Sequence, residues 1–397
     1  MVFGLANNAG NMAANLVMPE RPRILVITLR RLGDVLLTTP LLRTLRMHWP
    51  RATLETLVFR GSDRILKGNP DIDHVLIMPQ RPSGRESLIL IRQLWRRYDL
   101  VISTQAGDRP TFYAWVAGRF RVGLLPFPGR DGGWWKRFVY HRAVQAEPEM
   151  HRVEELRQFA LALGIDRWSD LVCPEGGSVG DIAPNGPYAV LHANPMYRYK
   201  RWSDEGWRAL ARGLVERGLS VVATEGRDPE ERAYVDALWT PSEVPITRER
   251  GRLDWAGLTV LLKGATVYVG PDTSMTHLAA GSGCPTVALY GPTRPKLIGP
   301  WPVGGLGRPW NDVGTIQRQG NVWLVQNPLP CMPCDKLGCE RHLESHSQCL
   351  DELPARQVLA AVDQALASRP HAVSPHRIEG GAGIQSPLSK DLIRHPT

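Results

Sequence analysis

From Ile24 to Pro40 the chain reads I-L-V-I-T-L-R-R-L-G-D-V-L-L-T-T-P, and this stretch predicts the fold. Its apolar start is typical of a buried strand, Gly33-Asp34 predicts a tight turn, and the remainder has the spacing of an amphipathic helix. Ligands of open parallel sheets bind beyond the carboxyl ends of the strands. Asp34 is therefore a candidate catalytic carboxylate, although an Asp at this position is more often only a helix cap.

Apolar runs alternate with amphipathic helices along most of the chain, which predicts an α/β fold with parallel sheets covered by helices. We expect strands at 24–28, 54–59, 75–78, 100–103, 188–192, 219–224, 267–269, 286–290 and 322–326. We expect helices at 86–97, 151–163, 204–217, 229–238, 274–282 and 354–368. In helix 86–97, Leu88, Ile91, Leu94 and Trp95 should share one apolar face.

The length of 397 residues fits two domains, and the turn-rich segments 175–178 and 183–187 predict a linker between them. The expected divisions are a flexible tail at 1–20, a first domain at 21–180, a second domain at 181–352, a closing helix at 353–369 and a disordered tail at 370–397.

The net charge of +9 is uneven, because residues 1–182 hold 25 Lys and Arg against 18 Asp and Glu. This excess indicates either a solvated basic surface or an anionic partner of the front half, such as a phosphorylated glycolipid, a membrane surface or nucleic acid. No nucleic-acid reading module is visible, and no G-x-G-x-x-G follows a strand, which disfavours a nicotinamide oxidoreductase. Without a transmembrane stretch or signal peptide, we expect a cytoplasmic protein.

Two further segments carry candidate chemistry. Residues 194–202 follow a strand and contain Arg198, Lys200 and Arg201, which could meet a diphosphate or simply form a solvated basic loop. At 270–277 a strand leads into a helix, and the backbone N–H groups of such a turn suit phosphate oxygens. Each residue of this turn is, taken alone, also compatible with an ordinary helix cap.

Together these motifs resemble glycosyltransferase family 9, the ADP-heptose:lipopolysaccharide heptosyltransferases. The front motif resembles G-D-V/L-x-L-T-x-P through Gly33, Asp34, Val35, Leu37, Thr38 and Pro40. K-R-W at 200–202 resembles the donor loop, and D-T-S-M-T-H-L-A-A at 272–280 with P-T-V-A-L-Y-G-P-T at 285–293 resembles the third motif. The resemblance covers roughly residues 22–352.

The resemblance implies a GT-B architecture, in which two Rossmann-like domains face each other across a cleft. The front domain would take a lipopolysaccharide core acceptor and the rear domain an ADP-sugar, with inversion at the sugar carbon. By carry-over, Asp34 would be the catalytic base and Lys200 would neutralise the departing diphosphate. Further donor contacts would come from Glu230 or Glu231 at the ribose and from Asp272, Thr273, Ser274 and His277.

The sequence departs from the family pattern near the expected ligands. Arg30 and Arg31 stand where many members have small hydroxyl residues, and Ser274 stands where many have Gly. Arg30 and Arg31, with Asp108 and Arg109, are therefore candidate acceptor contacts. Two other readings stay open: a protein acceptor, as for the autotransporter heptosyltransferases, or a nucleotide- or glycan-binding relative without activity. The intact Asp34 and Lys200 disfavour the latter.

Four cysteines cluster at Cys331, Cys334, Cys339 and Cys349, with His342 and His346 between them. Their spacing fits a structural zinc or iron site and fits reduced, buried thiols equally well. The resemblance implies that no metal is needed for the chemistry.

The stretch W-W-K-R-F-V-Y at 134–140 interleaves aromatic and basic residues. It predicts a buried strand with two exposed charges, or alternatively a loop at a bilayer interface. The expected partners are thus an ADP-sugar, an anionic glycolipid and the cytoplasmic face of the inner membrane, to which the protein would bind peripherally, and no nucleic acid.

Overall fold

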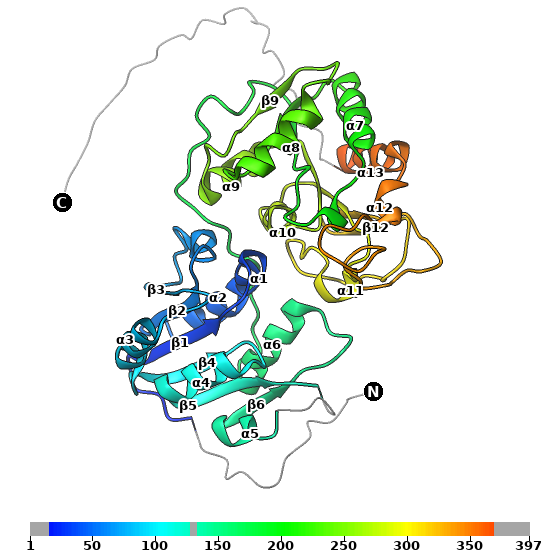
Figure 1. Ribbon diagram of the computed structural model, residues 1–397. Helices are drawn as coiled ribbons and strands as arrows, with labels where there is room; N and C mark the ends of the chain where they lie inside the picture. The colour runs from blue at the N-terminus through cyan, green and yellow to red at the C-terminus, as the bar shows by residue number, and fades with distance from the viewer. Residues whose placement is uncertain (1–15, 128–132, 369–397) are drawn as a thin grey trace, which may run out of the picture.

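The computed structural model describes residues 16–127 and 133–368, so the expected disordered tail at 370–397 and most of the tail at 1–20 lie outside the described residues. Two sheets with helices packed on them form two lobes, one from the front and one from the rear half of the chain (Figure 1). The architecture is α/β with two Rossmann-like halves, as predicted. None of the described helices is long and apolar enough to cross a membrane.

The front sheet has six parallel strands in the order β3-β2-β1-β4-β5-β6. Its strands are β1 (Arg23–Thr28), β2 (Thr53–Phe59), β3 (His74–Met78), β4 (Tyr98–Ser103), β5 (Gly118–Leu125) and β6 (Arg142–Gln145). Its helices are α1 (Leu32–Leu37), α2 (Thr39–His48), η1 (Asp63–Leu66), α3 (Gly84–Leu94), α4 (Asp108–Ala117), α5 (Lys136–Val139) and α6 (Arg152–Ala162). Residues 24–27 of β1 are fully buried, as in a central parallel strand covered on both faces.

The rear sheet has seven strands in the order β12-β13-β11-β10-β7-β8-β9, of which β12 alone among the described strands pairs antiparallel. Its strands are β7 (Tyr188–Leu191), β8 (Ser220–Ala223), β9 (Ile246–Arg248), β10 (Val267–Pro271), β11 (Thr286–Leu289), β12 (Ile316–Gln319) and β13 (Val322–Val325). Its helices are η2 (Arg198–Lys200), α7 (Asp204–Glu216), α8 (Pro229–Trp239), α9 (Trp255–Gly264), α10 (Ser274–Gly281), α11 (Pro295–Ile298), α12 (Gln348–Asp351) and α13 (Ala355–Ala367).

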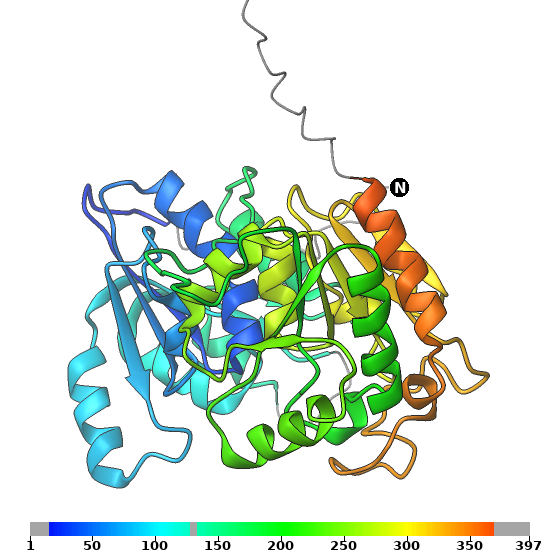
Figure 2. The ribbon, with the colours of Figure 1, turned by 90° about the horizontal axis from the view of Figure 1, so that it is seen from above.

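Helix α13 closes the rear lobe by lying beside α7, as the view from above shows (Figure 2). A Cβ on Gly213 of α7 would come within 2.7 Å of the Leu359 side chain of α13, so the glycine permits this close approach. The buried face of α13 contains Val358, Ala361, Val362 and Ala365. Their spacing is the helical one on which the prediction of this helix depended.

Several sequence-based expectations need correction. Gly33 and Asp34 are not a turn but belong to the first turn of α1, and the expected single helix breaks at Thr38, because α2 begins at Thr39 with Pro40 as its second residue. Proline has no N–H to continue the hydrogen-bond ladder of the preceding helix. Strands β5, β6, β9 and β12 were not predicted, because they are short or carry charged residues among the apolar ones.

Two apolar segments of the front lobe differ most from expectation. Helix α3 ends at Leu94 and buries Leu90 and Leu94, whereas Leu88 and Trp95, which we expected on one apolar face with Leu94, are exposed. Segment 134–140 is not a buried strand, because residues 136–139 form the short helix α5 and the side chain of Phe138 is exposed.

Candidate active site

The strand order creates one switch point in each sheet. In the front sheet β1 lies beside β4, and in the rear sheet β7 lies beside β10. From each of these pairs, the strand order continues outward in opposite directions. Crevices at the carboxyl ends of such strand pairs are the usual ligand sites of doubly wound sheets. The segments that follow these four strands contain Asp34, Asp108, Lys200 and Asp272. The topology therefore places most of the predicted site residues at the carboxyl ends of the strands in the two sheets.

These two groups of strand ends meet where α1 packs against α10 (Figure 1). A Cβ on Gly33 would lie 3.1 Å from the Ser274 hydroxyl oxygen and 3.6 Å from Cδ2 of His277. A Cβ contact of 3.1 Å is tighter than usual, so a larger residue in the first turn of α1 would press on Ser274. The first motif and the third motif, far apart in the sequence, are thus brought into van der Waals contact between the lobes.

Asp34 occupies the third position of α1 and does not act as the side-chain cap that its sequence context favoured. The capping position belongs to Arg31, which makes no side-chain hydrogen bond to the helix. The Asp34 carboxylate accepts a hydrogen bond of 3.3 Å from Arg30, and its side chain is only 13% exposed. It is therefore a largely buried carboxylate in the first turn of a helix, where a negative charge is favoured.

Arg152 is a neighbour of this site that the sequence analysis did not single out. Its buried guanidinium donates 3.0 Å to the Thr104 carbonyl, just after β4, and pairs with Glu155. Burial lowers the pKa of Arg152, and the nearby carboxylates of Glu155 and Asp34 act in the opposite direction. A buried cation at the amino end of α6 thus acts electrostatically on Asp34, and only the folded chain reveals it.

On the rear side, Lys200 forms an ion pair with the Asp272 carboxylate, and its ammonium also lies 3.5 Å from the Asp272 carbonyl. Burial acts to lower the pKa of Lys200, but the Asp272 carboxylate outweighs it and the net shift is upward. Conversely, burial acts to raise the pKa of Asp272, and Lys200 and His277 bring it below its usual value. Both groups are therefore held in their charged forms.

The first turn of α10 lies directly beside this pair. Thr273 caps the helix by accepting a hydrogen bond from the Thr276 N–H, and Ser274 is the first helical residue. His277 is buried, its Nε2 lies 4.0 Å from the Asp272 carboxylate, and its Nδ1 has no hydrogen-bond partner among the described residues. Burial lowers the pKa of His277, while the carboxylates of Asp272 and Asp34 oppose that shift.

The two glutamates predicted for the donor differ in their surroundings. Asp228 caps α8 through the N–H groups of Glu230 and Glu231. Glu231 turns back and accepts a hydrogen bond of 2.7 Å from the Gly226 N–H, whereas the side chain of Glu230 is exposed. The Glu231 carboxylate also acts on the partly buried ring of His192, which follows β7. Glu231 is therefore the glutamate that faces the strand edge.

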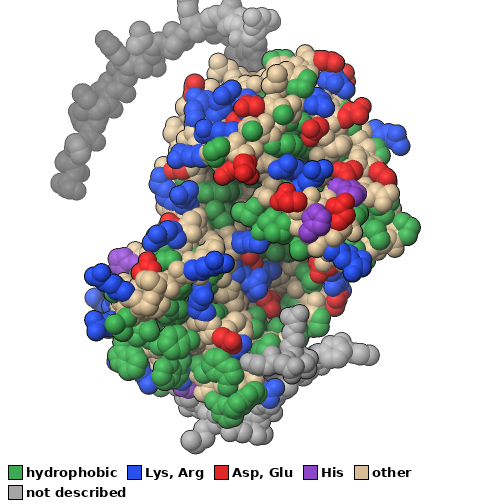
Figure 3. Space-filling model, in the orientation of Figure 1, with side chains coloured by type: hydrophobic (Ala, Val, Ile, Leu, Met, Phe, Trp, Pro, Cys, Tyr) green, Lys and Arg blue, Asp and Glu red, His purple; other side chains and the backbone are tan. Residues whose placement is uncertain are grey.

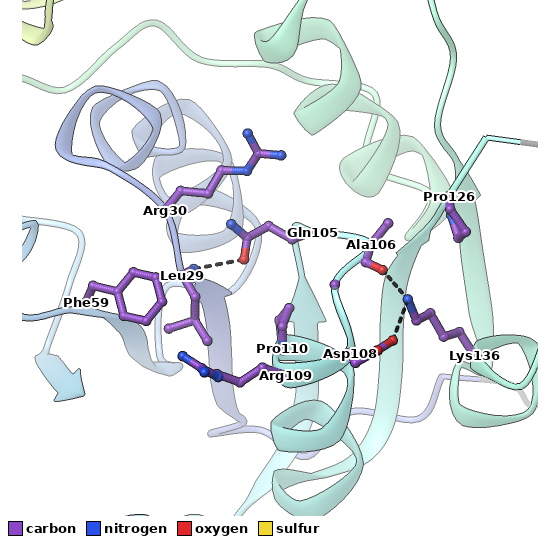
Figure 4. Close-up of a pocket in the computed structure, with 11 residues that line it drawn as sticks. Leu29, Arg30, Phe59, Gln105, Ala106, Asp108, Arg109, Pro110, Pro126 and Lys136 are labelled. Carbon is purple, nitrogen blue, oxygen red and sulfur yellow. Dashed lines mark hydrogen bonds and ion pairs between the residues drawn. The ribbon is translucent and has the colours of Figure 1, made fainter. Parts of the chain in front are cut away.

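A pocket of about 610 Å³ opens at the carboxyl ends of the front strands (Figure 4). Three of the four predicted acceptor residues line it, namely Arg30, Asp108 and Arg109. The fourth, Arg31, is not among its lining residues, and its guanidinium stacks 4.8 Å from the ring centre of Tyr197 in the rear lobe. Arg31 therefore links the lobes.

Lys136 is a lining residue that the sequence analysis misplaced, because it expected both cations of segment 134–140 to be exposed. Its side chain is buried, lies 2.9 Å from the Asp108 carboxylate and donates to the Ala106 carbonyl (Figure 4). Gln105, also missed, accepts a hydrogen bond of 3.1 Å from the Leu29 N–H. With Arg30, Arg109 and Lys136 against Asp108, the pocket has a positive charge that suits an anionic ligand.

The cysteine segment lies away from this pocket, on the chain leading to α12. Cys349 is buried, and burial together with the thiols of Cys334, Cys339 and Cys331 raises its pKa to about 12. His342 and His346 pair with Glu340 at 3.4 and 3.2 Å. Within residues 16–127 and 133–368, no three His, Cys, Asp or Glu side chains are arranged as a metal group. The metal site therefore stays a prediction.

The comparisons with known proteins agree with the two-lobed fold. Residues 88–304 match the family model of glycosyltransferase family 9 (heptosyltransferase). Lipopolysaccharide heptosyltransferase 1 of Pseudomonas aeruginosa is 30% identical over 359 residues, which are 85% of this chain and 93% of that protein.

Two solved structures show the same fold. The family 9 glycosyltransferase of Veillonella parvula has a TM-score of 0.69 and 19% identity, and the alignment covers 88% of this chain and 98% of that one. The heptosyltransferase WaaC of E. coli, solved with ADP, has a TM-score of 0.63 and 21% identity, with 86% of this chain and 99% of that one covered. At these identities the structural likeness establishes the GT-B architecture of two facing lobes.

Proposed function

The chain belongs to glycosyltransferase family 9, and from that premise we propose that it transfers heptose from ADP-heptose to a lipopolysaccharide core acceptor, with inversion at the sugar carbon. The observation that carries this proposal is the contact between the amino ends of α1 and α10, which brings Asp34 of the front lobe close to the Asp272–His277 turn of the rear lobe. A base and a leaving-group site on opposite sides of one gap suit a displacement at a sugar carbon.

In the proposed reaction, the Asp34 carboxylate takes the proton of the acceptor hydroxyl as the oxygen attacks the anomeric carbon of the sugar. The bond between this carbon and the diphosphate oxygen breaks, and the departing ADP carries the electron pair. Lys200, Thr273, Ser274 and His277 would hold the diphosphate, and Glu231 would hold the ribose. The physical support is a partly buried ammonium beside a helix amino end, both of which favour anionic oxygens.

The front pocket would bind the acceptor. The pocket has an excess of positive side chains, namely Arg30, Arg109 and Lys136. These cations would attract the phosphates or carboxylates of a lipopolysaccharide core. We further propose that the enzyme works at the cytoplasmic face of the inner membrane, where such an acceptor would be anchored. The proposed domain division at about residue 180 assigns the acceptor to the front lobe and the donor to the rear lobe.

A binding panel tests the proposal directly. ADP-heptose, GDP-mannose and UDP-glucose are titrated separately into the purified full-length protein by calorimetry, followed by a transfer assay with a lipopolysaccharide core lacking heptose. We expect binding of the ADP-sugar alone and inverted stereochemistry in the product. Equal binding of all three donors, or binding without transfer to any core acceptor, would contradict the assignment.

We also propose that Cys331, Cys334, Cys339 and Cys349 hold a structural metal ion, with the transfer chemistry itself independent of metal. Four thiols are a fitting donor set for zinc or iron, and three of them contribute to the raised pKa of the fourth. Elemental analysis of protein purified without added metal should find about one zinc or iron per chain. Metal-free protein with four freely titrating thiols and undiminished stability would rule this out.

A further inference from the structure

Large hydrophobic side chains are exposed on one side of the front lobe, over α3, α4 and α5 (Figure 3). Helix α4 lies between the other two and packs against both. Six of these side chains leave 42–78% of their surface exposed, namely Leu88, Ile89, Trp95, Phe112, Trp115 and Phe138. With Trp134, whose ring meets that of Phe138 edge-on at 6.0 Å, they form what we call the outer apolar face.

This face is unusual for a surface that meets only water. Soluble proteins rarely expose contiguous patches of large apolar side chains, and those that do commonly use them for binding. Five of its seven residues are aromatic, and the rings of Phe112 and Trp115 lie 6.3 Å apart on α4. Aromatic rings, above all those of Trp, are enriched where proteins meet the boundary between lipid headgroups and acyl chains.

The exposed charges on the same segments are mostly positive. Within 84–96, 108–119 and 133–139, the exposed cations are Arg85, Arg92, Arg96, Arg109, Arg119 and Arg137. The exposed carboxylates of these segments are Glu86 and Asp108. Aromatic side chains bordered by arginines are the combination that anionic lipid surfaces attract. A second copy of this face would instead bring arginines against arginines, which disfavours self-association.

The outer apolar face borders the front pocket. Helix α4 begins with Asp108 and Arg109, which line the pocket, and carries Phe112 and Trp115 on its exposed side. Helix α5 likewise places Lys136 in the pocket and Phe138 outside it. A surface on which these two helices rest would therefore lie next to the pocket mouth.

We propose that the outer apolar face docks on an anionic bilayer, with its aromatic rings in the headgroup layer and its arginines against lipid phosphates. The proposal rests on the proposed function in one respect, because docking there would bring the pocket to an acceptor whose acyl chains stay in the membrane. The docking itself is a property of the surface and is measured without any reaction.

The first experiment measures co-sedimentation of the full-length protein with vesicles of phosphatidylethanolamine and phosphatidylglycerol, and with vesicles of phosphatidylcholine alone. The test variant is Phe112→Ser/Trp115→Ser/Phe138→Ser. Its control, Leu161→Ser/Val260→Ser/Leu343→Ser, changes three exposed apolar residues outside this face. Wild type and control should bind the anionic vesicles, and the test variant should bind them at least about tenfold more weakly, because binding scales with the apolar area inserted.

The second experiment separates charge from apolar contact. Arg85→Gln/Arg92→Gln should weaken binding to the anionic vesicles by about fivefold per arginine at low salt and by less at high salt. Arg308→Gln/Arg341→Gln, which removes two exposed arginines from the rear half, should leave binding unchanged. Equal binding of wild type to neutral and anionic vesicles, or equal losses in test and control variants, would overturn the proposal. So would a lipid-free oligomer that buries the face and binds no vesicles.

A transfer assay distinguishes failure of docking from failure of the proposed function. On a water-soluble core acceptor without acyl chains, the triple-serine test variant should turn over like wild type, whereas on vesicle-embedded acceptor it should be slower by about the factor lost in binding. Vesicle binding without transfer would contradict the proposed function alone. Transfer that is equally fast for both variants on embedded acceptor would contradict the docking proposal alone.

Discussion

Asp34 lies in the first turn of α1 with its carboxylate against Arg30 and largely shielded from water. On the opposite side of the gap, the partly buried Lys200 forms an ion pair with the buried Asp272. Removing either partner of this pair would leave the other charge uncompensated. The ammonium of Lys200 could also pair with a bound diphosphate.

Replacing Asp34 by Asn keeps the shape of the side chain and removes its basicity. If it is the general base, turnover of Asp34→Asn should fall by about 10²–10⁴-fold, while affinity for ADP-heptose changes little. Steady-state kinetics and calorimetry on the same preparation measure both quantities. Asp166→Asn, which alters an exposed carboxylate of the front lobe, is the control and should keep full activity. Near-normal turnover of Asp34→Asn would refute its role.

Lys200→Ala should weaken binding of ADP by about tenfold or more, because a hydrogen bond to a charged group contributes roughly 1.5–3 kcal/mol. The matched control is Arg198→Ala in the same short helix η2, whose side chain is exposed. Calorimetric titration with ADP compares the two variants at a temperature at which melting curves show both folded. An ADP affinity of Lys200→Ala equal to that of wild type would exclude a direct contact of Lys200 with the diphosphate.

Among the elements, α1 and α10 depend most on each other. Their close approach is possible because Gly33 has no side chain to meet the Ser274 hydroxyl. Ser274 narrows the space between the two helices, because its hydroxyl oxygen is the atom nearest to a side chain at residue 33. The consequence is a strict size limit at residue 33.

Gly33→Val should therefore destabilise the protein by about 1–3 kcal/mol and reduce donor binding, because two helix ends at the site are forced apart. Ser274→Gly removes the atom nearest to the new side chain. The double variant Gly33→Val/Ser274→Gly should recover part of the lost stability, so that the two changes are non-additive. Donor binding of the double variant is compared with that of Ser274→Gly alone, because Ser274 is itself a proposed diphosphate contact. Denaturant unfolding measures the stability, and calorimetry the donor affinity, of the four proteins in this double-mutant cycle. Strict additivity would mean that residues 33 and 274 do not act on each other.

At the scale of the whole molecule, the lobes are joined by polar contacts around a buried histidine. His151 accepts a hydrogen bond from the Val153 N–H at one ring nitrogen and, with the other, lies 2.9 Å from the Gly299 carbonyl in the rear lobe. Nearby, Glu149 pairs with Arg294 and Lys296 at 2.8 Å, and these cations lower the pKa of Glu149 to about 2. Both ring nitrogens of His151 are satisfied in the neutral form.

Burial lowers the pKa of His151 from 6.5 to about 4. Between these values the unfolded chain binds a proton that the folded chain does not, so stability present above pH 6.5 is lost as the pH falls towards 4. The loss from this group should approach about 3 kcal/mol at 1.36 kcal/mol per pKa unit. In His151→Gln the decline in unfolding free energy over this range should be smaller by that amount. Parallel curves for both proteins would contradict the assignment.

The order of the main elements follows from the amino-acid sequence alone. A short, fully apolar run such as residues 24–27 is typical of a strand that is covered on both faces of a parallel sheet. The helical spacing of apolar residues in α13 marks the face that it buries. The motif residues were found in the sequence because they follow strands, and a strand's carboxyl end is a local feature. Strands without a continuous apolar run, such as β5 and β6, could not be predicted from the sequence pattern.

Which of these strand ends meet, and which side chains stay exposed, depends on how distant segments of the chain pack together. Arg152 and Lys136 became part of the site because burial against distant backbone carbonyls, and not any local pattern, sets their positions. The outer faces of α3 and α4 likewise carry apolar residues whose exposure depends on what the fold leaves uncovered. Periodicity identifies an apolar position, but whether it is covered depends on packing between elements far apart in the chain.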